Sequence, residues 1–393
     1  MKIVYLHHAN VYRAGIERML AVKANLLAEQ MGWEIMMLTY EQNGKPFPYP
    51  LSPKVKCVDL GVHLYDAYKC AYPMRWFRRR ALCRKLAEEM RVFLSAEHPD
   101  IVVCTDKDAH ELDALSKART TERIFIEAHT GMIDHDMQVL RVKGFVKKLI
   151  ARRDLNRLKK AVSHFDTLIA LTPDDAKCWS PYVKTVIIPN YLPSYPEQVA
   201  DLSVEKKRVV MVGRVDYQKG QDLLLQAWQQ VNLRHPDWHL DMFGDSDASN
   251  VFRSHLSGLH AESFTFHPST PAIYDEYLQS DFLVCSSRWE SFGLILIEAM
   301  SCGIPVVSFN CDNGPRNIIA DGEDGLLVRN GDIADLANKI CWLIEHREQR
   351  EQMGGAARQN VKRFCQDIVL SQYVEFLENA CRHVQPSFQR EQP

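Results

Sequence analysis

Short apolar runs alternate along the chain with longer stretches in which apolar residues recur at helical spacing. Seven of these runs precede residue 190 and predict buried strands at Lys2–Leu6, Glu34–Leu38, Val55–Leu60, Ile101–Cys104, Arg123–Glu127, Thr167–Leu171 and Val183–Ile188. Helical patterns separate them. Strands that alternate with helices form parallel sheets covered on both faces, so the pattern predicts an α/β, doubly wound domain.

Three prolines between Pro189 and Pro196 interrupt this pattern, and a polar stretch to Lys207 follows. We interpret this segment as an interdomain linker. Strands are then predicted at Arg208–Gly213, His239–Phe243, Ser263–Phe266, Phe282–Cys285 and Ile304–Val307, and helices at Ile333–Glu345, Glu348–Arg363 and Ile368–Arg382. We therefore expect domains at residues 1–195 and 196–365, a last helix and tail at 366–393, and disorder from Gln385 to Pro393.

Composition limits the class of protein. Of the 393 residues, 46% are apolar and 25% are charged, as in globular proteins, and no apolar stretch approaches the roughly 20 residues that span a bilayer. The amino terminus is predicted to be a first strand and not a signal peptide. Eleven cysteines without CxxC pairs favour reduced, mostly buried thiols. These features predict a cytoplasmic location.

Charge is unevenly distributed along the chain. Residues 1–195 carry 30 lysines and arginines against 22 aspartates and glutamates, whereas the remaining residues carry 18 against 28. Two basic helices, one starting near Arg75 and one predicted to begin at Arg141 and continue to Lys160, account for the excess. Such helices can bind anionic lipid headgroups. A solvated helix face is the alternative, and neither stretch matches a nucleic-acid-binding module.

Two carboxylates flank a predicted strand-loop-helix junction between Ser286 and Ser308. Ser291 is a plausible N-cap that leaves Glu290 on the loop, while Glu298 lies two turns into the helix. Gly293 lets a ligand approach the backbone, and a carboxylate on a helix can accept two hydrogen bonds from a ribose diol. An exposed acidic helix start remains the alternative.

Cationic and imidazole side chains follow other predicted strands. Arg214 and Lys219 come after Gly213, where two cations can converge on one phosphate group. His129 follows a strand of the first domain, at the sheet edge where open α/β sheets bind ligands. An exposed loop and a structural histidine are the alternatives that these patterns leave open.

Several of these segments together resemble one known family. They are Glu-Ser-Phe-Gly with seven residues between Glu290 and Glu298, Cys-Gly-Ile-Pro-Val-Val from Cys302, Gly-Arg then four residues then Lys-Gly from Gly213, and Gly15-Ile16-Glu17-Arg18. The chain is similar to the retaining glycosyltransferases of the GT-B fold, family 4 (glycosyl transferases group 1). Within that family it resembles the branch that builds surface polysaccharides. In the first loop the family's first glycine is replaced by Ala14.

The resemblance implies a fold and a set of residue roles. The fold is GT-B, in which two Rossmann-like domains face each other across a cleft. Glu298 would hold the nucleotide ribose, Glu290 the donor sugar, and Arg214 and Lys219 the diphosphate. His129 would meet the sugar near its anomeric centre. The remaining donor-binding positions implied by the motifs are Gly15, Gly213, Ser291, Phe292, Gly293 and Leu294.

The resemblance also implies an activity. A hexosyltransferase-like enzyme would move a sugar from a nucleoside diphosphate sugar to an acceptor hydroxyl, with the anomeric configuration retained and with no metal or other cofactor. We expect the acceptor to be a lipid-linked glycan for capsule, O-antigen or exopolysaccharide synthesis, met at an anionic membrane surface. We expect no nucleic-acid partner.

Other functions stay open from the sequence alone. A sugar-nucleotide epimerase of the same fold, or a catalytically silent nucleotide-sugar-binding partner, would carry similar motifs. A nicotinamide-dependent dehydrogenase is disfavoured, because no G-x-G-x-x-G follows the strands that begin at Lys2 and Arg208. Asp245-Ser246-Asp247 has the spacing of a metal-binding pair, but we interpret it as a loop.

Overall fold

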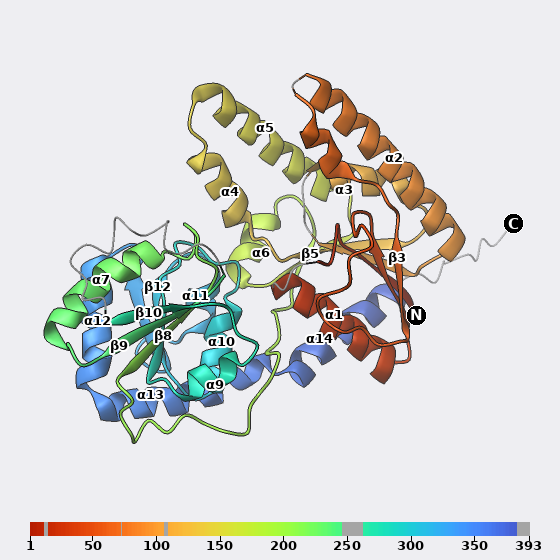
Figure 1. The fold of residues 1–393 in the computed structure, drawn as a ribbon. Coiled ribbons are helices and arrows are strands. Elements are labelled where there is room, and N and C mark those ends of the chain that lie inside the picture. Colours follow the sequence, from red (N-terminus) through yellow and green to blue (C-terminus); the bar gives the residue numbers. More distant parts are fainter. Residues whose placement is uncertain (12–14, 72, 106–108, 246–261, 383–393) are drawn as a thin grey trace, which may run out of the picture.

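The computed structural model describes the chain except for residues 12–14, 72, 106–108, 246–261 and 383–393. Two α/β domains lie side by side, each built around one sheet (Figure 1). All strand pairs recorded in the two sheets are parallel. The predicted doubly wound α/β class is therefore confirmed.

The first sheet has seven strands in the order β3-β2-β1-β4-β5-β6-β7. Ile3 in β1 lies opposite Ile35 on one side and Ile101 on the other. Chain order reverses between β1 and β4, and open α/β sheets bind ligands beyond the strand ends at such a reversal. The strands are β1 Lys2–Leu6, β2 Glu34–Thr39, β3 Val55–Asp59, β4 Ile101–Thr105, β5 Arg123–Ala128, β6 Thr167–Ala170 and β7 Thr185–Ile187.

The second sheet has six strands in the order β10-β9-β8-β11-β12-β13, and its reversal falls between β8 and β11. β11 is buried along its whole length, as the continuous apolar run Phe282–Cys285 predicts for a central parallel strand. The strands are β8 Arg208–Val212, β9 His239–Phe243, β10 Phe264–His267, β11 Phe282–Cys285, β12 Val306–Asn310 and β13 Gly325–Arg329.

Helices cover both faces of each sheet. Two hydrophobic clusters fill the first domain, one on each face of its sheet, and two more fill the second domain. The helices are α1 Gly15–Gln30, α2 Met74–Glu97, α3 Ala109–Ala118, α4 Met132–Arg141, α5 Phe145–Val162, α6 Pro173–Trp179, α7 Gln221–Arg234, α9 Ile273–Leu278, α10 Leu294–Ser301, α11 Gly314–Ile318, α12 Ile333–Glu345, α13 Arg347–Asn360 and α14 Gln366–Arg382, with 3-10 turns η1 Leu64–Lys69 and η3 Val361–Phe364.

The start of the second basic helix differs from the prediction. The basic helix expected to begin at Arg141 begins at Phe145, and Arg141 is instead the last residue of α4. Gly144 separates the two helices with φ of 96°, a conformation that a residue without a side chain adopts most readily. The cations of this segment therefore belong to two helices and the turn between them.

The last helix returns from the second domain to the first. Figure 1 shows α14 beside α1, on the face of the first sheet away from α2 and α3. Tyr373 and Leu377 of α14 are buried in one cluster with Tyr5 and Met19, and the hydroxyls of Tyr373 and Tyr5 lie 3.0 Å apart. This helix therefore completes the core of the amino-terminal domain.

Three expectations from composition meet different outcomes. All eleven cysteines are free, but only five of them are buried, so the expectation of mostly buried thiols is too strong. Among the described helices, none is long and apolar enough to cross a membrane. The disorder predicted from Gln385 onward lies outside the described residues.

Candidate active site

Two loops that leave adjacent strands of the second sheet carry most of the predicted site. One runs from Gly213 to Gly220 after β8, and the other from Ser286 to Gly293 after β11, which pairs with β8. A Cβ atom on Gly220 would lie 2.1 Å from the backbone oxygen of Ser286. The loops approach this closely only because residue 220 is a glycine, which also holds φ at 66°.

A lysine and a glutamate join the two loops. The Nζ atom of Lys219 lies 2.5 Å from Oε1 of Glu290, and the Ser287 hydroxyl donates to the same oxygen at 2.7 Å. Both charged side chains are largely buried, with exposed fractions of 17% and 7%. Burial alone would lower the pKa of Lys219, but the Glu290 carboxylate raises it. Lys219 is therefore held as a cation beside the predicted sugar-binding carboxylate.

Arg214 occupies the other end of the β8 loop and faces solvent. Its side chain is 70% exposed, and its nearest carboxylate is Asp216 at 3.5 Å. Asp216 in turn accepts a hydrogen bond from the backbone N–H of Lys219 at 2.9 Å. The two predicted clamp cations thus belong to one loop but pair with different carboxylates here. Gly213 lies against the Lys219 stem, since a Cβ there would be 3.3 Å from it.

The start of α10 differs from the prediction. Ser291 is not its N-cap, because the helix begins at Leu294 and is preceded by Gly293 with φ of 95°. The Ser291 hydroxyl instead bonds to the first domain, accepting from the N–H of Gly131 and donating to Asp134. Glu298 is consequently the fifth residue of α10, a little more than one turn in rather than two.

Glu298 points to the first domain. Its Oε1 atom lies 3.2 Å from Nη1 of Arg18 in α1, and its Oε2 atom accepts from the Tyr277 hydroxyl at 3.3 Å. Burial raises the pKa of Glu298, although Arg18 and Tyr277 act in the opposite direction. The sequence motif included Arg18, but its pairing with Glu298 was not predicted, since the two are 280 residues apart.

Other predicted donor-binding residues surround this helix start. Leu294 approaches Gly15 of the first domain so closely that a Cβ on Gly15 would lie 3.3 Å from its side chain. Phe292 is buried, and its ring lies edge-on to that of Phe364 with the two ring centres 5.5 Å apart. Phe292 therefore anchors the loop, while Gly15 and Leu294 bring the domains together. Ala14, which stands where the family has its first glycine, lies outside the described residues.

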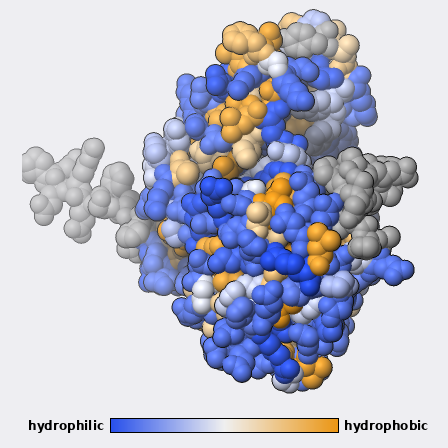
Figure 2. Space-filling model, turned by 90° about the vertical axis from the view of Figure 1, so that its left-hand side faces the viewer, coloured by the Kyte–Doolittle hydropathy of each residue, from blue (hydrophilic) through white to orange (hydrophobic). Residues whose placement is uncertain are grey.

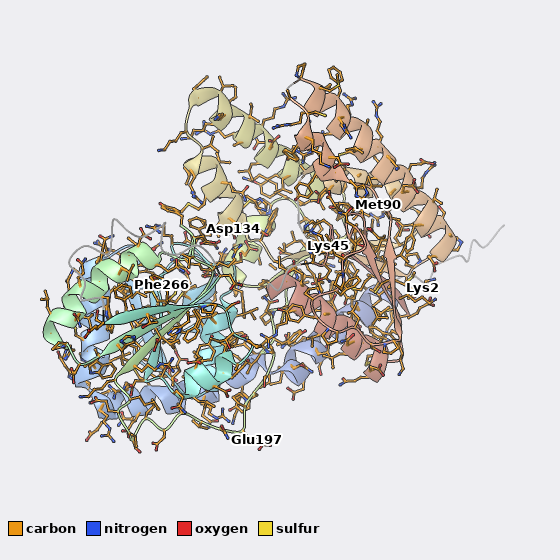
Figure 3. All side chains as sticks on the ribbon, in the orientation of Figure 1. Lys2, Lys45, Met90, Asp134, Glu197 and Phe266 are labelled. Atoms are coloured by element: carbon orange, nitrogen blue, oxygen red, sulfur yellow. The ribbon has the colours of Figure 1, made fainter. Side chains whose placement is uncertain are left out.

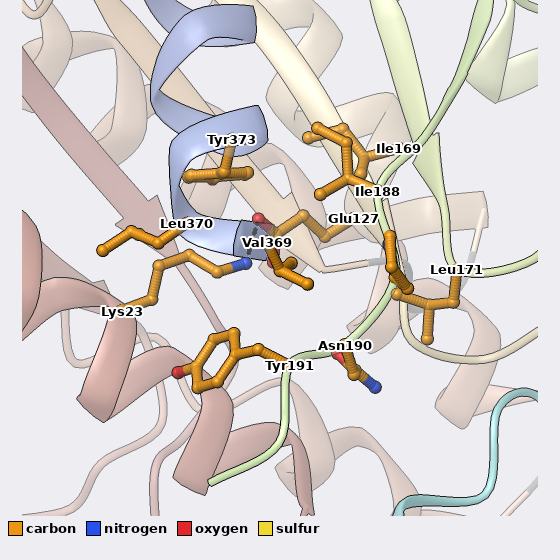
Figure 4. Close-up of a pocket in the computed structure, with 11 residues that line it drawn as sticks. Lys23, Glu127, Ile169, Leu171, Ile188, Asn190, Tyr191, Val369, Leu370 and Tyr373 are labelled. Carbon is orange, nitrogen blue, oxygen red and sulfur yellow. Dashed lines mark hydrogen bonds and ion pairs between the residues drawn. The ribbon is translucent and has the colours of Figure 1, made fainter. Parts of the chain in front are cut away.

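His129 is turned toward the interior of the first domain. Its Nε2 atom lies 3.0 Å from Oε2 of Glu127, and only 3% of its side chain is exposed. Oε1 of the same glutamate accepts from Lys23 at 2.7 Å, and Figure 4 shows this pair facing Tyr373 of α14. Burial alone would raise the pKa of Glu127, but Lys23 and His129 hold it well below its usual range. His129 is thus fixed by a carboxylate that the motifs did not reveal.

Asp134 is a further polar residue that the sequence did not assign. It extends from α4 of the first domain and accepts hydrogen bonds from Trp289 and Ser291, the two neighbours of Glu290. Burial raises the pKa of Asp134, while these two hydrogen bonds lower it. Nothing in the sequence distinguishes it from Asp136, because only the folded chain brings it to the second domain.

Among the described residues, no group of three or more His, Cys, Asp or Glu side chains could hold a metal ion. Asp245 accepts two hydrogen bonds from Ser269. Ser246 and Asp247, which complete the Asp-x-Asp spacing, lie outside the described residues. Arg214, Lys219 and Arg18 are cationic side chains of the described site.

Comparison with known protein families and sequences places the site in context. Residues 197–360 match the family model for glycosyl transferases group 1. An uncharacterized glycosyltransferase of Haemophilus influenzae is 26% identical over 88% of this chain and 90% of its own length. The amylovoran biosynthesis glycosyltransferase AmsD of Erwinia amylovora is 28% identical, over 44% of this chain and 48% of its own length.

Solved structures resemble both domains together. Sucrose-phosphate synthase from Thermosynechococcus elongatus superposes with a TM-score of 0.76 at 19% identity, covering 97% of this chain and 99% of that one. The Anabaena protein Alr3699/HepE, solved in complex with UDP and glucose, gives a TM-score of 0.69 at 18% identity, covering 96% and 99%. The predicted GT-B arrangement of the two domains is confirmed.

Proposed function

We propose that this chain, which is a glycosyltransferase with the GT-B fold and takes its sugar from a nucleotide sugar, retains the anomeric configuration and delivers the sugar to a lipid-linked glycan. The observation that carries the proposal is the buried contact between Lys219 and Glu290, with Glu298 farther along the helix that follows. A nucleoside diphosphate sugar joins a sugar, a diphosphate and a ribose in that order, and we assign Glu290, Lys219 and Glu298 to these three parts in turn.

In this proposal each side chain meets one part of the donor. Glu298, the fifth residue of α10, accepts hydrogen bonds from the ribose hydroxyls, and Arg18 occupies their place in this structure. Glu290 binds the sugar, and Lys219 and Arg214 bind the diphosphate. Gly213, Gly15 and the segment Ser291–Leu294 line the same donor site. Alr3699/HepE was solved with UDP and glucose, which supports a nucleotide and a sugar as ligands of this fold.

The proposed reaction breaks the bond between the anomeric carbon and the diphosphate oxygen. An acceptor hydroxyl bonds to that carbon from the face the diphosphate leaves, and the hydroxyl proton passes to the departing phosphate. Negative charge builds on the diphosphate, so Lys219 and Arg214 stabilise the transition state more than the ground state. These cations supply the charge that a metal ion would otherwise provide. His129, held by Glu127, orients the sugar from the strand end of the first domain.

The acceptor side is a basic and apolar surface. We define the basic end of the first domain as residues 74–80 of α2 together with residues 140–153 of α4, α5 and the turn between them. It contains ten lysines and arginines and no acidic residue. Figure 2 shows hydrophobic side chains among hydrophilic ones at the end of the molecule that carries these helices. Exposed apolar residues there include Met74, Phe77, Leu140, Phe145, Val146, Leu149 and Ile150.

This combination fits an anionic membrane surface. Phe145 is 85% exposed at the first turn of α5, next to Lys147 and Lys148. Apolar side chains can enter the interface while each nearby cation contributes about 1 kcal/mol from anionic lipid.

The test of the reaction is a donor-consumption assay with the full chain. A panel of UDP-, GDP-, ADP- and dTDP-sugars is offered with and without a lipid extract that contains polyprenyl-linked glycans. Transfer of labelled sugar into the lipid fraction supports the proposal. Consumption that forms only a sugar epimer would replace it with an epimerase. Absence of any consumption across the panel would favour a silent binding partner.

The test of the surface is liposome co-sedimentation at low and high salt. Binding to anionic vesicles should weaken strongly as the Debye length falls from about 10 Å at 0.1 M to about 3 Å at 1 M. Replacing Lys147 and Lys148 by glutamine should reduce binding, whereas the same change at Lys54 and Lys56, also exposed, should not. Equal behaviour of the two double variants would contradict a membrane role for α5.

A further inference from the structure

One helix of the first domain reaches across to both catalytic loops of the second. α4 follows directly from the strand end that carries His129, and Asp134 lies in its first turn. Figure 3 labels Asp134 where the two domains meet. The motifs assign no role to this residue.

The Asp134 carboxylate is surrounded by donors. Its Oδ1 atom accepts from Nε1 of Trp289 at 2.6 Å and from Nε2 of Gln218 at 3.4 Å. Its Oδ2 atom accepts from the Ser291 hydroxyl at 2.6 Å and from the N–H of Gly131 at 3.1 Å. Three of the four donors belong to the second domain. A carboxylate can accept about four hydrogen bonds, so these four donors occupy all the acceptor sites of Asp134.

These donors bracket the charged pair described above. Trp289 and Ser291 are the residues on either side of Glu290, and Gln218 directly precedes Lys219. Gln218 also donates to the backbone oxygen of Trp289 at 3.1 Å, which ties the two loops together beneath the carboxylate. A single side chain of the first domain therefore fixes both loops of the donor site.

Two further contacts place the same helix against the second domain. At its amino-terminal end, a Cβ on Gly131 would lie 2.9 Å from Nδ2 of Asn313, so the absence of a side chain permits the approach. At its other end, the Arg141 guanidinium lies 4.4 Å from the ring centre of Tyr217 in the β8 loop. Contacts at both ends of α4 hold its direction as well as its position.

We propose that Asp134 is a positioning residue that joins the two domains and sets the Glu290 and Lys219 loops against the strand end of the first domain. Without its carboxylate the loops keep their own fold, because Lys219, Ser287 and Glu290 bond within the second domain. What is lost is their placement relative to the other domain. The expected fall in kcat rests on the proposed function, whereas the role of Asp134 in joining the two domains does not.

The experiment compares Asp134→Asn with Asp136→Asn, a carboxylate two residues along the same helix. An amide replaces one acceptor oxygen by a donor that faces Ser291 or Trp289. For Asp134→Asn we expect kcat for transfer to fall by at least about 10-fold, because misplacement of reacting groups is costly. The affinity for free UDP or GDP, measured by calorimetry, and the melting temperature should stay close to wild type. Asp136→Asn should match the wild type throughout.

A structural readout separates this proposal from the proposed function. Small-angle scattering with saturating nucleoside diphosphate should show a larger radius of gyration for Asp134→Asn than for Asp136→Asn, even if the chain transfers no sugar. Trp289→Phe, which removes one donor only, should give an intermediate value. Equal radii for all variants together with wild-type kcat in Asp134→Asn would overturn the proposal. An equal fall in kcat and nucleotide affinity would also overturn it, since that result indicates damage within the donor domain.

Discussion

Two buried lysine–glutamate pairs, one in each domain, have similar geometry and different surroundings. Lys219 and Glu290 lie 2.5 Å apart on loops beyond the strands of the second sheet. Lys23 and Glu127 lie 2.7 Å apart, but Glu127 is within strand β5 and the lysine ammonium lies 4.2 Å from the Tyr373 ring. The first pair borders the domain interface, whereas the second lines a small pocket beside α14 (Figure 4).

This difference assigns separate roles to the same chemistry. In the proposed function, the pair on loops exchanges partners when the donor binds, and Lys219 then meets the diphosphate. The pair in the first domain packs against Tyr373 of α14 and holds His129, so it contributes to the stability of that domain. The surroundings of each ion pair, and not its distance, therefore decide whether it serves chemistry or architecture.

Removing the carboxylate of the Lys23–Glu127 pair should lower the stability of the protein strongly. Glu127→Gln leaves Lys23 as an uncompensated buried charge, which costs about 3–5 kcal/mol of unfolding free energy. The measurement is urea denaturation followed by circular dichroism. Its control is Glu34→Gln, which removes an exposed partner of Lys56 and should cost less than about 1 kcal/mol. An equal loss of unfolding free energy in the two variants would show that the Lys23–Glu127 pair contributes no more to stability than an exposed ion pair.

Disrupting the Lys219–Glu290 pair should instead lower catalytic turnover. Lys219→Ala should lower donor turnover by about 100-fold, because it removes a charge interaction that strengthens as the diphosphate departs. Its unfolding free energy should fall less than that of Glu127→Gln. Lys207→Ala, at an exposed lysine of the same domain, serves as the control in the same steady-state assay. Turnover near the wild-type rate in Lys219→Ala would remove this lysine from the catalytic account.

A smaller effect concerns the pH dependence of nucleotide binding. Burial raises the pKa of Glu298, so its carboxylate should protonate at a higher pH than an exposed glutamate. Affinity for free nucleoside diphosphate should then be full above that pKa and fall as the pH drops through it, because protonation removes an acceptor for the ribose. Calorimetry between pH 8 and 5 measures this. Glu298→Gln should bind more weakly with a flatter profile, while Glu290→Gln should keep the wild-type profile; identical profiles for all three proteins would contradict the ribose role.

Much of the fold follows from local pattern. Buried parallel strands are continuous apolar runs, so β8, β9 and β11 lie within a residue of their predicted bounds. Helix starts are less predictable from local sequence than strands are. Ser291 has the chemistry of an N-cap, yet its hydroxyl bonds to another domain and Gly293, two residues later, is the N-cap.

The cross-domain and buried contacts could not be read from the sequence. Lys23 and Glu127 are separated by 104 positions, and Asp134 and Ser291 by 157. Motifs mark residues that meet a ligand, whereas these partners meet other protein groups. Only the packing of α1, α4 and α14 brings them to the site, so no local signal identifies them.

The anomeric configuration of the product distinguishes retention from inversion. Proton NMR of the transferred sugar gives its anomeric configuration from the coupling between the first two ring protons, and the donor provides the reference. We expect the same configuration in donor and product, and a product formed only when an acceptor is present. An inverted product would contradict retention, and a sugar epimer formed without acceptor would contradict transfer itself.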